Sequence, residues 1–407
     1  MPKEDWTSRA LREVITLHEP MLAVHDPADE VATVGIRWYG MGLFAKPARR
    51  SDIKGESYYA LKPGALIYSR LFAWKQSFAV VTDEFADVIA SDEFPQFDVD
   101  PELATAEYLA LYCGSPNFAQ RALERSDGAT AISRNRLKVP DFLDLPAVLP
   151  PLDTQRKIVE IVAAVDAALV ATEREAAAIA SLLLIRREAL TNDPEQPEAK
   201  AEDAFDIRLG RQRSPERATG PSMTKYLRSA NVGHDELRLD DVMEMDFNDK
   251  ERDRLKLEVG DVLVSEGSAG AGAVGMPAAW NGELDGPVCF QNTLLRYRAR
   301  HGVTTPEFVR HWCLWAYESG AFRDACPPGV NILHIGSTRA KAMRMRLPSL
   351  ESQRAIVEEL EPLTAAVASL RSEAKRLRDV RASLLDGLLT QKIDIVDAPD
   401  ARSISST

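Results

Sequence analysis

The sequence has 407 residues, 45% of them hydrophobic and 7% aromatic, which is enough for two or three domains with buried cores. Its net charge of −12 argues against a protein that binds nucleic acid through bulk charge, although local basic patches remain compatible with DNA binding. This composition does not indicate wholesale disorder.

The beginning of the chain carries no predicted targeting segment. Residues 1–5 are MPKED and are not followed by an apolar segment, so no signal peptide is predicted. The apolar runs are far shorter than the ~20 residues that a membrane helix needs. The four cysteines show no CxxC spacing and are expected to be reduced. We therefore expect a cytoplasmic protein that does not associate with membranes.

Residues 1–151 are predicted to form a first globular domain. Within them, residues 61–70 (LKPGALIYSR) have the pattern of a turn that leads into an apolar strand, and residues 108–113 are expected to be helical. Basic residues cluster at Arg49 and Arg50, and again at Arg134 and Arg136. The expected class is α+β.

A twelve-residue segment occurs twice in the chain. LPPLDTQRKIVE at 149–160 and LPSLESQRAIVE at 347–358 are identical at eight of twelve positions. Apolar residues then recur in steps of four and three, from Ile158 and from Ile356, for more than four heptads. This period predicts long helices that supercoil on a partner. We expect the two helices to pair antiparallel, because a duplicated unit implies a pseudo-twofold axis. The alternative is two separate amphipathic helices, each packed on its own domain.

The remaining boundaries follow from this repeat. We predict a central spacer helix over 152–191, an acidic linker over 192–203 and a second domain over 204–348. A distal spacer helix is expected over 349–395 and a disordered tail over 396–407. The second domain repeats the first more faintly, with a turn and strand at 257–266 and a helix at 308–313.

Several motifs that suggest chemistry are better explained otherwise. GAGAVG at 270–275 matches a dinucleotide-binding pattern, but Pro277 and Gly282 exclude the helix that this site requires, and a hairpin or DNA-facing loop is expected. The chain has no Gly-Lys dipeptide for a phosphate-binding loop and no Asn-Pro-Pro-aromatic motif of an adenine methyltransferase. His311, Cys313, Cys326 and His334 match no standard zinc spacing, so we predict core packing and no metal.

Basic residues in predicted loops are the candidates for contacts with DNA phosphates and guanine edges. The alternative for each one is ordinary solvated surface. Residues 1–151 contain 16 basic and 22 acidic residues, and residues 204–348 contain 20 and 19, so patches must act against an acidic background. The DNA-binding candidates are Arg49, Arg50, Arg70, Lys75, Arg134, Arg136, Arg211, Arg213, Lys225 and Arg228.

These features together resemble the specificity subunits of type I restriction-modification enzymes. The LPxLxxQRxI segments resemble the spacer regions of that family, and YLRSANV at 226–232, GDVL at 260–263 and FQNT at 290–293 resemble its target recognition domains. IYSRLFAW at 67–74 and SDEFP at 91–95 resemble another branch of the same domain. Ala65 departs from the family, in which Asp usually follows this glycine.

The resemblance implies a non-catalytic subunit in which two target recognition domains each read one half of a bipartite site in double-stranded DNA. It implies that the spacer helices dock two methyltransferase subunits and that restriction-translocase subunits join to cut. No cofactor would bind this chain, whereas S-adenosylmethionine and ATP with Mg²⁺ would bind the partners. The expected spacer and partner-docking residues are Gln155, Ile158, Val162, Leu169, Gln353, Ile356, Leu360 and Val367.

Two alternatives remain open at this point. The chain is also compatible with a specificity-like subunit of another defence or modification system. It is compatible as well with a coiled-coil scaffold whose globular ends bind proteins.

Overall fold

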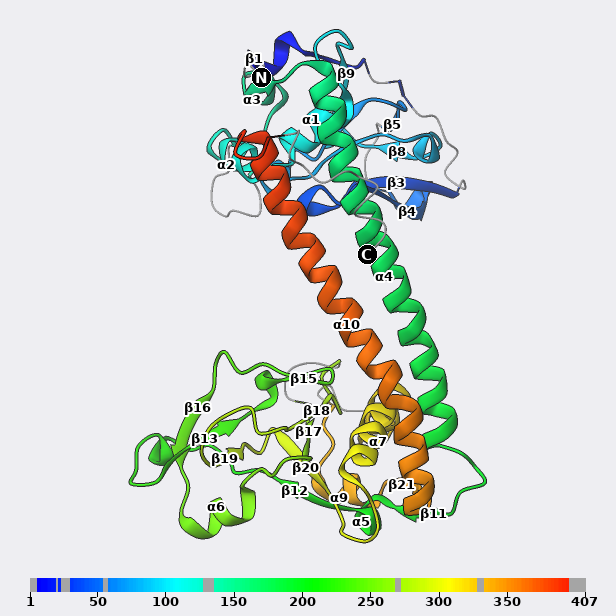
Figure 1. The fold of residues 1–407 in the computed structure, drawn as a ribbon, viewed down its shortest axis with the longest axis vertical. Coiled ribbons are helices and arrows are strands. Elements are labelled where there is room, and N and C mark those ends of the chain that lie inside the picture. The colour runs from blue at the N-terminus through cyan, green and yellow to red at the C-terminus, as the bar shows by residue number, and fades with distance from the viewer. Residues whose placement is uncertain are drawn as a thin grey trace. The chain divides into compact units, whose positions relative to one another are not determined.

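The computed structural model describes residues 6–19, 21–22, 30–53, 58–126, 135–267, 272–327 and 333–394 (Figure 1). The chain divides into two compact units. The first unit comprises residues 1–172 and 372–407, and the second comprises residues 173–371. Each unit therefore contains one globular domain together with part of each of two long helices. The predicted tail over 396–407 lies outside the described residues.

The first domain is built on two small sheets. The strand orders are β2-β9-β6-β7 and β4-β3-β8-β5, and β1 pairs with β10 beside them. Its strands are β1 (Thr7–Ala10), β2 (Ile15–Leu17), β3 (Glu30–Ile36), β4 (Leu43–Arg49), β5 (Tyr59–Ala60), β6 (Leu66–Tyr68), β7 (Phe78–Val80), β8 (Ile89–Ala90), β9 (Gln96–Val99) and β10 (Pro146–Leu149). Its helices are α1 (Ala106–Cys113), α2 (Pro116–Glu124) and α3 (Val139–Leu143).

The second domain repeats this plan. Its sheets have the orders β12-β20-β17-β18 and β16-β13-β19, with the pairs β11-β21 and β14-β15. Its strands are β11 (Glu198–Lys200), β12 (Phe205–Leu209), β13 (Met223–Leu227), β14 (Val232–Gly233), β15 (Glu236–Leu237), β16 (Met243–Asp246), β17 (Val262–Ser265), β18 (Pro277–Ala279), β19 (Val288–Phe290), β20 (Leu294–Ala299) and β21 (Arg344–Arg346). Its helices are α5 (Ala201–Ala204), α6 (Asp249–Leu255), α7 (Pro306–Glu318), α8 (Ala321–Asp324) and α9 (Ser337–Ala342).

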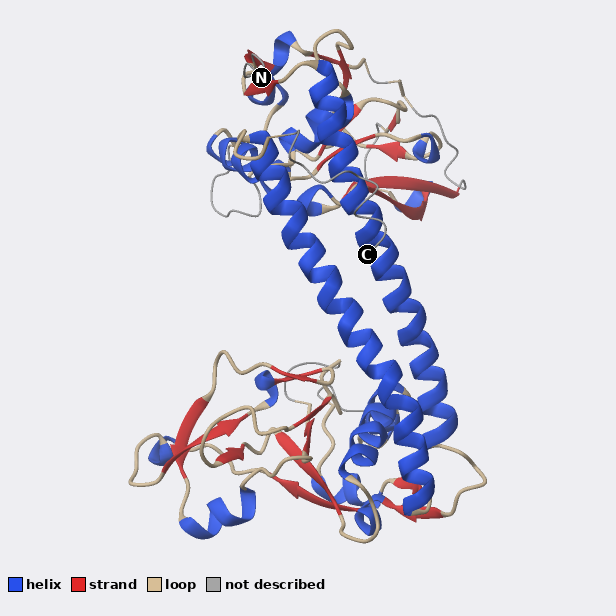
Figure 2. Cartoon of the chain, in the orientation of Figure 1, coloured by secondary structure: helices blue, strands red, loops and turns tan. Residues whose placement is uncertain are grey.

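The correspondence between the two domains extends to strand direction, because β3 pairs parallel with β8 and β13 pairs parallel with β19. The predicted turn-and-strand segments form β6 and β17, and the turns before them place Gly64 and Gly260 at φ values of 82° and 91°. Ala65 therefore leaves the turn unchanged. The mixed helix and sheet composition, visible in Figure 2, confirms the α+β class.

The structure corrects the predicted linker over 192–203. Residues 198–204 form strand β11 and helix α5, and Ala201 and Ala204 are fully buried. Strand β11 pairs with β21 as β1 pairs with β10, and Glu198 forms an ion pair with Arg344 at 2.8 Å. The acidic composition suggested exposure, but half of the segment opens the second domain.

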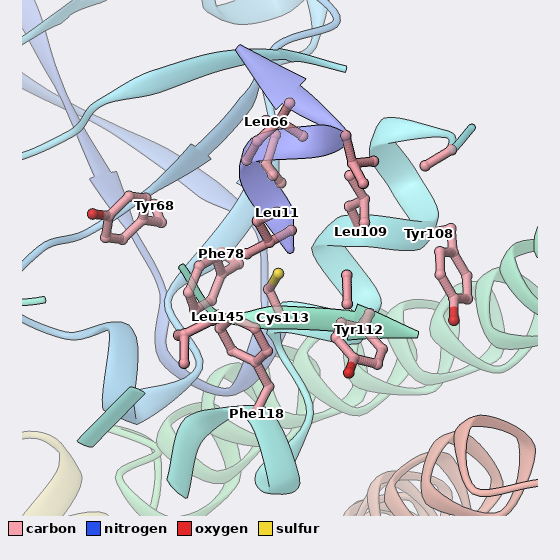
Figure 3. Packing of buried hydrophobic residues seen from close by; sticks show 14 of the residues in the cluster. Leu11, Leu66, Tyr68, Phe78, Tyr108, Leu109, Tyr112, Cys113, Phe118 and Leu145 are labelled. Atoms are coloured by element: carbon pink, nitrogen blue, oxygen red, sulfur yellow. The ribbon is translucent and has the colours of Figure 1, made fainter. Parts of the chain in front are cut away.

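Each domain has an aromatic core. In the first domain, the Phe78 ring packs against Tyr68 and Phe118, in the same cluster as Cys113 (Figure 3). The second domain places Trp312 among Phe205, Tyr297 and Phe322, in the same cluster as Cys313. All four cysteines are free and buried. Burial raises the pKa of the Cys289 thiol to about 12, so this thiol is protonated and inert at neutral pH.

The two predicted spacer helices are confirmed as α4 (Leu152–Thr191) and α10 (Leu350–Leu389), each of 40 residues. At 1.5 Å per residue, each is about 60 Å long. Helix α10 ends before the predicted residue 395, because Gln391 adopts a φ of 55° and the N–H groups of Lys392 and Ile393 return to the carbonyl of Gly387. None of the described helices is long and apolar enough to cross a membrane.

The heptad positions form the internal seam of each unit. In the first unit, Ile158, Val162 and Val165 of α4 share a core with Leu384 and Leu388 of α10. The second unit buries Leu183 of α4 with Leu360 and Val367 of α10. Ion pairs join Arg381 to Asp166 in the first unit and Arg186 to Glu359 in the second. An early residue of one helix thus meets a late residue of the other, so the helices pair antiparallel within each unit.

The repeated glutamine anchors each domain to its long helix. Gln155 Oε1 accepts the Thr105 N–H at 3.0 Å, and its Nε2 donates to the carbonyls of Leu103 and Pro150 at 2.9 Å each. Gln353 makes the same three bonds to Thr305, Val303 and Pro348, at the same distances. Both glutamines are fully buried. The repeated motif is therefore a clamp that joins helix α1 or α7 to the start of a long helix.

All eight residues predicted for spacer and partner docking are buried inside the chain. The exposed fraction is at most 7%, the value for Ile356. They belong to the seam and the glutamine clamps, and their role in partner docking stays a prediction.

We predict that Gln155→Ala loosens the first unit and that Gln353→Ala loosens the second. Each change leaves three backbone groups without a buried partner, which costs about 1–3 kcal/mol for each such group left unsatisfied. Hydrogen exchange of the full chain is expected to accelerate around residues 103–108 or 303–308, in the altered unit alone. The exposed neighbour offers a control, Lys157→Ala, which should change neither segment. Equal acceleration in both units would contradict the clamp.

Candidate nucleic-acid interface

In the first domain, two of the predicted DNA-binding arginines pair with carboxylates of their own domain. Arg70 lies 3.5 Å from Asp92, and Arg136 lies 2.6 Å from Glu93. The hydrogen bond and the negative charge of Glu93 raise the pKa of Arg136. A phosphate would have to compete with these carboxylates. Arg134 lies outside the described residues.

Two of the four candidates of the second domain also pair with carboxylates of their own domain. Arg211 lies 3.1 Å from Glu251, and Arg228 lies 2.5 Å from Asp241. Burial raises the pKa of Glu251, but hydrogen bonds from Arg217 and Asn248 and the charge of Arg211 outweigh this, so the net pKa is lowered. Lys225 donates a long bond of 3.5 Å to the Asp285 carbonyl. Arg213 is exposed and pairs with no carboxylate within the described residues.

Two of the other candidates of the first domain, Arg49 and Lys75, form no ion pair with a carboxylate among the described residues. Lys75 Nζ lies 3.4 Å from the centre of the Trp38 ring, and Arg50 lies 5.1 Å from the Tyr58 ring. Arg49 is exposed at the end of β4. Among the nine described candidates, four form ion pairs within their own domain, two lie over aromatic rings, two are exposed and Lys225 donates to a backbone carbonyl.

The residues around Lys75 form a surface that the sequence analysis did not identify. Residues 31–51 and 58–82 contain seven of the 16 basic residues of the first domain and none of its 22 acidic residues. A scan for acid-free segments would have found it in an otherwise acidic domain. We define the β3–β4 surface as Arg37, Trp38, Tyr39, Phe44, Lys46 and Lys75.

Large rings are exposed on the β3–β4 surface. Trp38 is 42% exposed, Tyr39 58% and Phe44 38%. Lys75 covers one face of Trp38, and Arg37 lies 5.2 Å from the centre of the Phe44 ring. Among the described residues, Arg37, Lys46 and Lys75 form no ion pair with a carboxylate. Exposed rings interleaved with unpaired cations suit a polyanion that also presents flat apolar groups, which describes a nucleic acid.

The residues that suggested a zinc site serve the core. His311 is fully buried, with Nε2 3.1 Å from Glu361, and Cys313 lies inside the aromatic cluster of the second domain. Within the described parts of the chain, no group of three or more His, Cys, Asp or Glu side chains gathers as metal ligands do. The dinucleotide-like motif lies between strands β17 and β18, which pair antiparallel, and its residues 270 and 271 lie outside the described residues.

Both units contain a cavity at the corresponding place, where the domain meets its long helices. In the first unit a cavity of about 240 Å³ is lined by Gly40, Ala110, Ala163 and the paired Asp166 and Arg381. In the second unit a cavity of about 500 Å³ is lined by charged residues, among them Arg187, His234, Asp235, Arg310 and Glu318. The corresponding cavities of the two units therefore differ in volume and in the charge of the residues that line them.

A network of charges ties the second domain to both long helices. Arg310 of α7 lies 2.6 Å from Asp235, in the turn between β14 and β15, and 2.8 Å from Glu361 of α10. Glu318 of α7 accepts hydrogen bonds from Arg187 of α4 at 2.5 Å and contacts His234 at 3.2 Å. We call these six residues with His311 the charge network. In the first unit, the repeat-equivalent residues of Arg310 and Glu361 are Ala110 and Ala163.

The pKa values of three members of the charge network are lowered, which favours two charged glutamates and a neutral histidine at neutral pH. Burial lowers the pKa of His311, although its hydrogen bond to Glu361 acts against this. That hydrogen bond is the largest influence on Glu361 and lowers its pKa. Burial raises the pKa of Glu318, but His234 and Arg187 lower it by more, so the net pKa is lowered. All three lowered pKa values mean that protonation is easier in the unfolded chain, so acid destabilises this region.

We predict that acid opens the β14–β15 turn before the β3–β4 turn of the first domain. The contribution of His311 should decline below pH 6.5 and those of Glu318 and Glu361 below pH 4.5, their ordinary values. Hydrogen exchange between pH 7.5 and about 3.5, corrected for intrinsic rates, measures this for residues 232–237 and 37–42.

Arg310→Ala is the matched variant, because it gives the second domain the residue type found at position 110. It should open the β14–β15 turn at pH 7.5 and flatten its pH dependence. An equal acid response of the two turns in the unaltered chain would disprove the role of the charge network.

Comparison with known proteins gives a likeness in fold. No protein-family model matches the sequence, and no curated protein is similar enough to match. A type I restriction-modification S subunit from M. genitalium has a TM-score of 0.58 and 12% identity, over 95% of this chain and 97% of that chain.

Two further solved structures cover nearly the whole chain. One, from work on complex assembly and conformational transition of the type I R-M system, has a TM-score of 0.57 and 17% identity, over 96% of this chain and 98% of that chain. An HsdS subunit from Thermoanaerobacter tengcongensis has 17% identity and a TM-score of 0.44, over 97% and 98% of the two chains. The chain thus has the fold of a type I restriction-modification S subunit, as the resemblance implied.

Proposed function

We propose that this protein is the DNA-specificity subunit of a type I restriction-modification system. In this proposal it is a cytoplasmic protein without a catalytic centre, and each domain reads one half of a bipartite site in double-stranded DNA. The observation that carries the proposal is the duplication itself. The glutamine clamp and the heptad seam occur twice with matching bonds, whereas the domain surfaces differ.

A common frame with two different surfaces suits a protein that reads two different sequences. A scaffold that bound the same protein at both ends would need two similar surfaces instead. The β3–β4 surface of the first domain carries exposed rings and cations, whereas the corresponding turn of the second domain folds into the charge network. The fold likeness to S subunits over 95% or more of the chain supports the same reading.

Chemistry in this proposal belongs to partner subunits. Two methyltransferase subunits would bind S-adenosylmethionine and methylate adenine, and restriction subunits would use ATP with Mg²⁺ to translocate and cut. The exposed faces of the long helices are the proposed docking sites. Leu182 is 47% exposed on α4 and Val380 is 52% exposed on α10, and the two positions are separated by the repeat offset of 198. Equivalent exposed apolar residues suit two copies of one partner.

The first test of this proposal concerns the spacer length. Inserting one heptad into each long helix, next to Ala176 and Ala374, keeps the seam in register and adds about 10 Å to each helix. Both half-sites are expected to stay the same while the gap between them widens. Mapping of methylated adenines in cells that express the chain with its methyltransferase measures both. Altered half-sites, or an unaltered gap, would refute the spacer role.

The second test concerns docking. Leu182→Glu and Val380→Glu together are expected to weaken the association with the methyltransferase tenfold or more, since burying a leucine or valine side chain contributes about 2 kcal/mol. Each single variant should lose one of two copies. The mass of the co-purified complex measures the stoichiometry.

Two control variants, Ala177→Glu on α4 and Lys375→Glu on α10, place a carboxylate on another side of each helix. Both positions are exposed, and they are separated by the repeat offset of 198. These controls should assemble normally. Absence of both a co-purifying methyltransferase and a split methylation motif would instead favour the coiled-coil scaffold.

A further inference from the structure

The turn between β3 and β4 holds a bulky residue in an unfavourable backbone conformation. Tyr39 has φ 61° and ψ 32°, in the left-handed region that suits glycine, asparagine or aspartate. Its ring is 58% exposed, and no hydrogen bond or ring contact to it occurs among the described residues. Such strain in an exposed aromatic residue indicates a function outside the folded domain.

In the second domain, the β14–β15 turn also contains a residue in the left-handed conformation, and this residue binds another part of its own domain. Asp235 has a φ of 57°, and its carboxylate accepts two hydrogen bonds from Arg310 at 2.8 and 2.6 Å. Aspartate tolerates this conformation, and the side chain braces the domain against α7. The first domain has Ala110 instead of an arginine on α1. Tyr39 therefore has no comparable internal role.

The turn is fixed, so the Tyr39 ring is presented rather than loose. The Arg37 N–H donates to the Gly42 carbonyl at 2.9 Å, and the Gly40 N–H donates to the Gln76 carbonyl at 3.1 Å. Next to Tyr39, the Trp38 ring lies against Phe72 at 5.6 Å between ring centres and under the ammonium of Lys75. The turn thus has a rigid base and one free ring.

We infer that Tyr39 is a stacking contact of the first domain with DNA, in which its ring packs against a base step of that domain's half-site. The inference rests on the proposed DNA-binding function. Aromatic rings stack on bases of any sequence, and neighbouring cations hold the phosphates on either side. Arg37, Lys46 and Lys75 supply those cations, in segments without a single acidic residue. An acidic protein partner would match the cations but would leave the exposed rings unexplained.

The test compares two substitutions in the complete complex with methyltransferase. Tyr39→Asn keeps the left-handed turn and removes the ring, whereas Tyr39→Phe keeps the ring. The probe is a duplex that carries the methylation motif mapped for the unaltered protein, with 2-aminopurine placed in turn at the adenines of the first half-site. Tyr39→Asn should weaken binding about tenfold and abolish the fluorescence change at one position. Tyr39→Phe should stay within about twofold of the unaltered protein on both measures.

The controls separate the alternatives. Met21→Ala removes another exposed apolar side chain of the first domain, 70% exposed, and should bind normally. The thermal unfolding midpoint and the assembly with methyltransferase, measured without DNA, should be the same for all variants. Normal DNA binding by Tyr39→Asn, or a loss of assembly that parallels the loss of binding, would overturn the inference and, in the second case, assign the surface to the protein partner. If the unaltered complex bound no split motif, the proposed function itself would fail.

Discussion

Burial of apolar side chains at 3.5-residue intervals is the constraint on which the rest of the structure depends. Two 40-residue helices of this kind are too long to be covered by a small domain, so each hides its seam against the other. The repeat places the same pairing at two points along the chain, with Leu384 and Leu388 completing one core and Leu360 and Val367 the other. Neither domain has a complete core without residues from both helices.

The two copies share the hydrogen bonds of the glutamine clamps and differ in the residues around them. Gln155 and Gln353 satisfy the same three backbone groups, because an unsatisfied buried polar group is costly in either copy. A few residues away, Ala110 and Arg310 give their units a small cavity and a network of charges respectively. Changes there leave the clamp and the seam intact, so the frame constrains the domain surfaces only weakly.

Local periodicity explains which features could be predicted from the sequence. The long helices and their antiparallel pairing follow from heptads and from an offset of 198, and both are present. The predicted linker was wrong over its second half. Strand β11 is fixed there by its pairing with β21, which lies about 145 residues later and leaves no local pattern. Arg70, Arg136, Arg211 and Arg228 resembled free cations because their carboxylate partners are distant or irregularly spaced. The clamp role of Gln155 and Gln353 could not be predicted for the same reason, since most of their backbone partners lie about 50 residues away.

The division of the chain into units has a consequence for biosynthesis. The second unit is formed by one continuous stretch, residues 173–371, which interrupts the first unit. The core of the first domain joins Leu11 to Leu384, Leu385 and Leu388, which are synthesised more than 370 residues after Leu11. The domain that leaves the ribosome first is therefore the last to be completed, and it waits with an open apolar seam while the other finishes. Chaperone dependence during translation should be concentrated in that first domain.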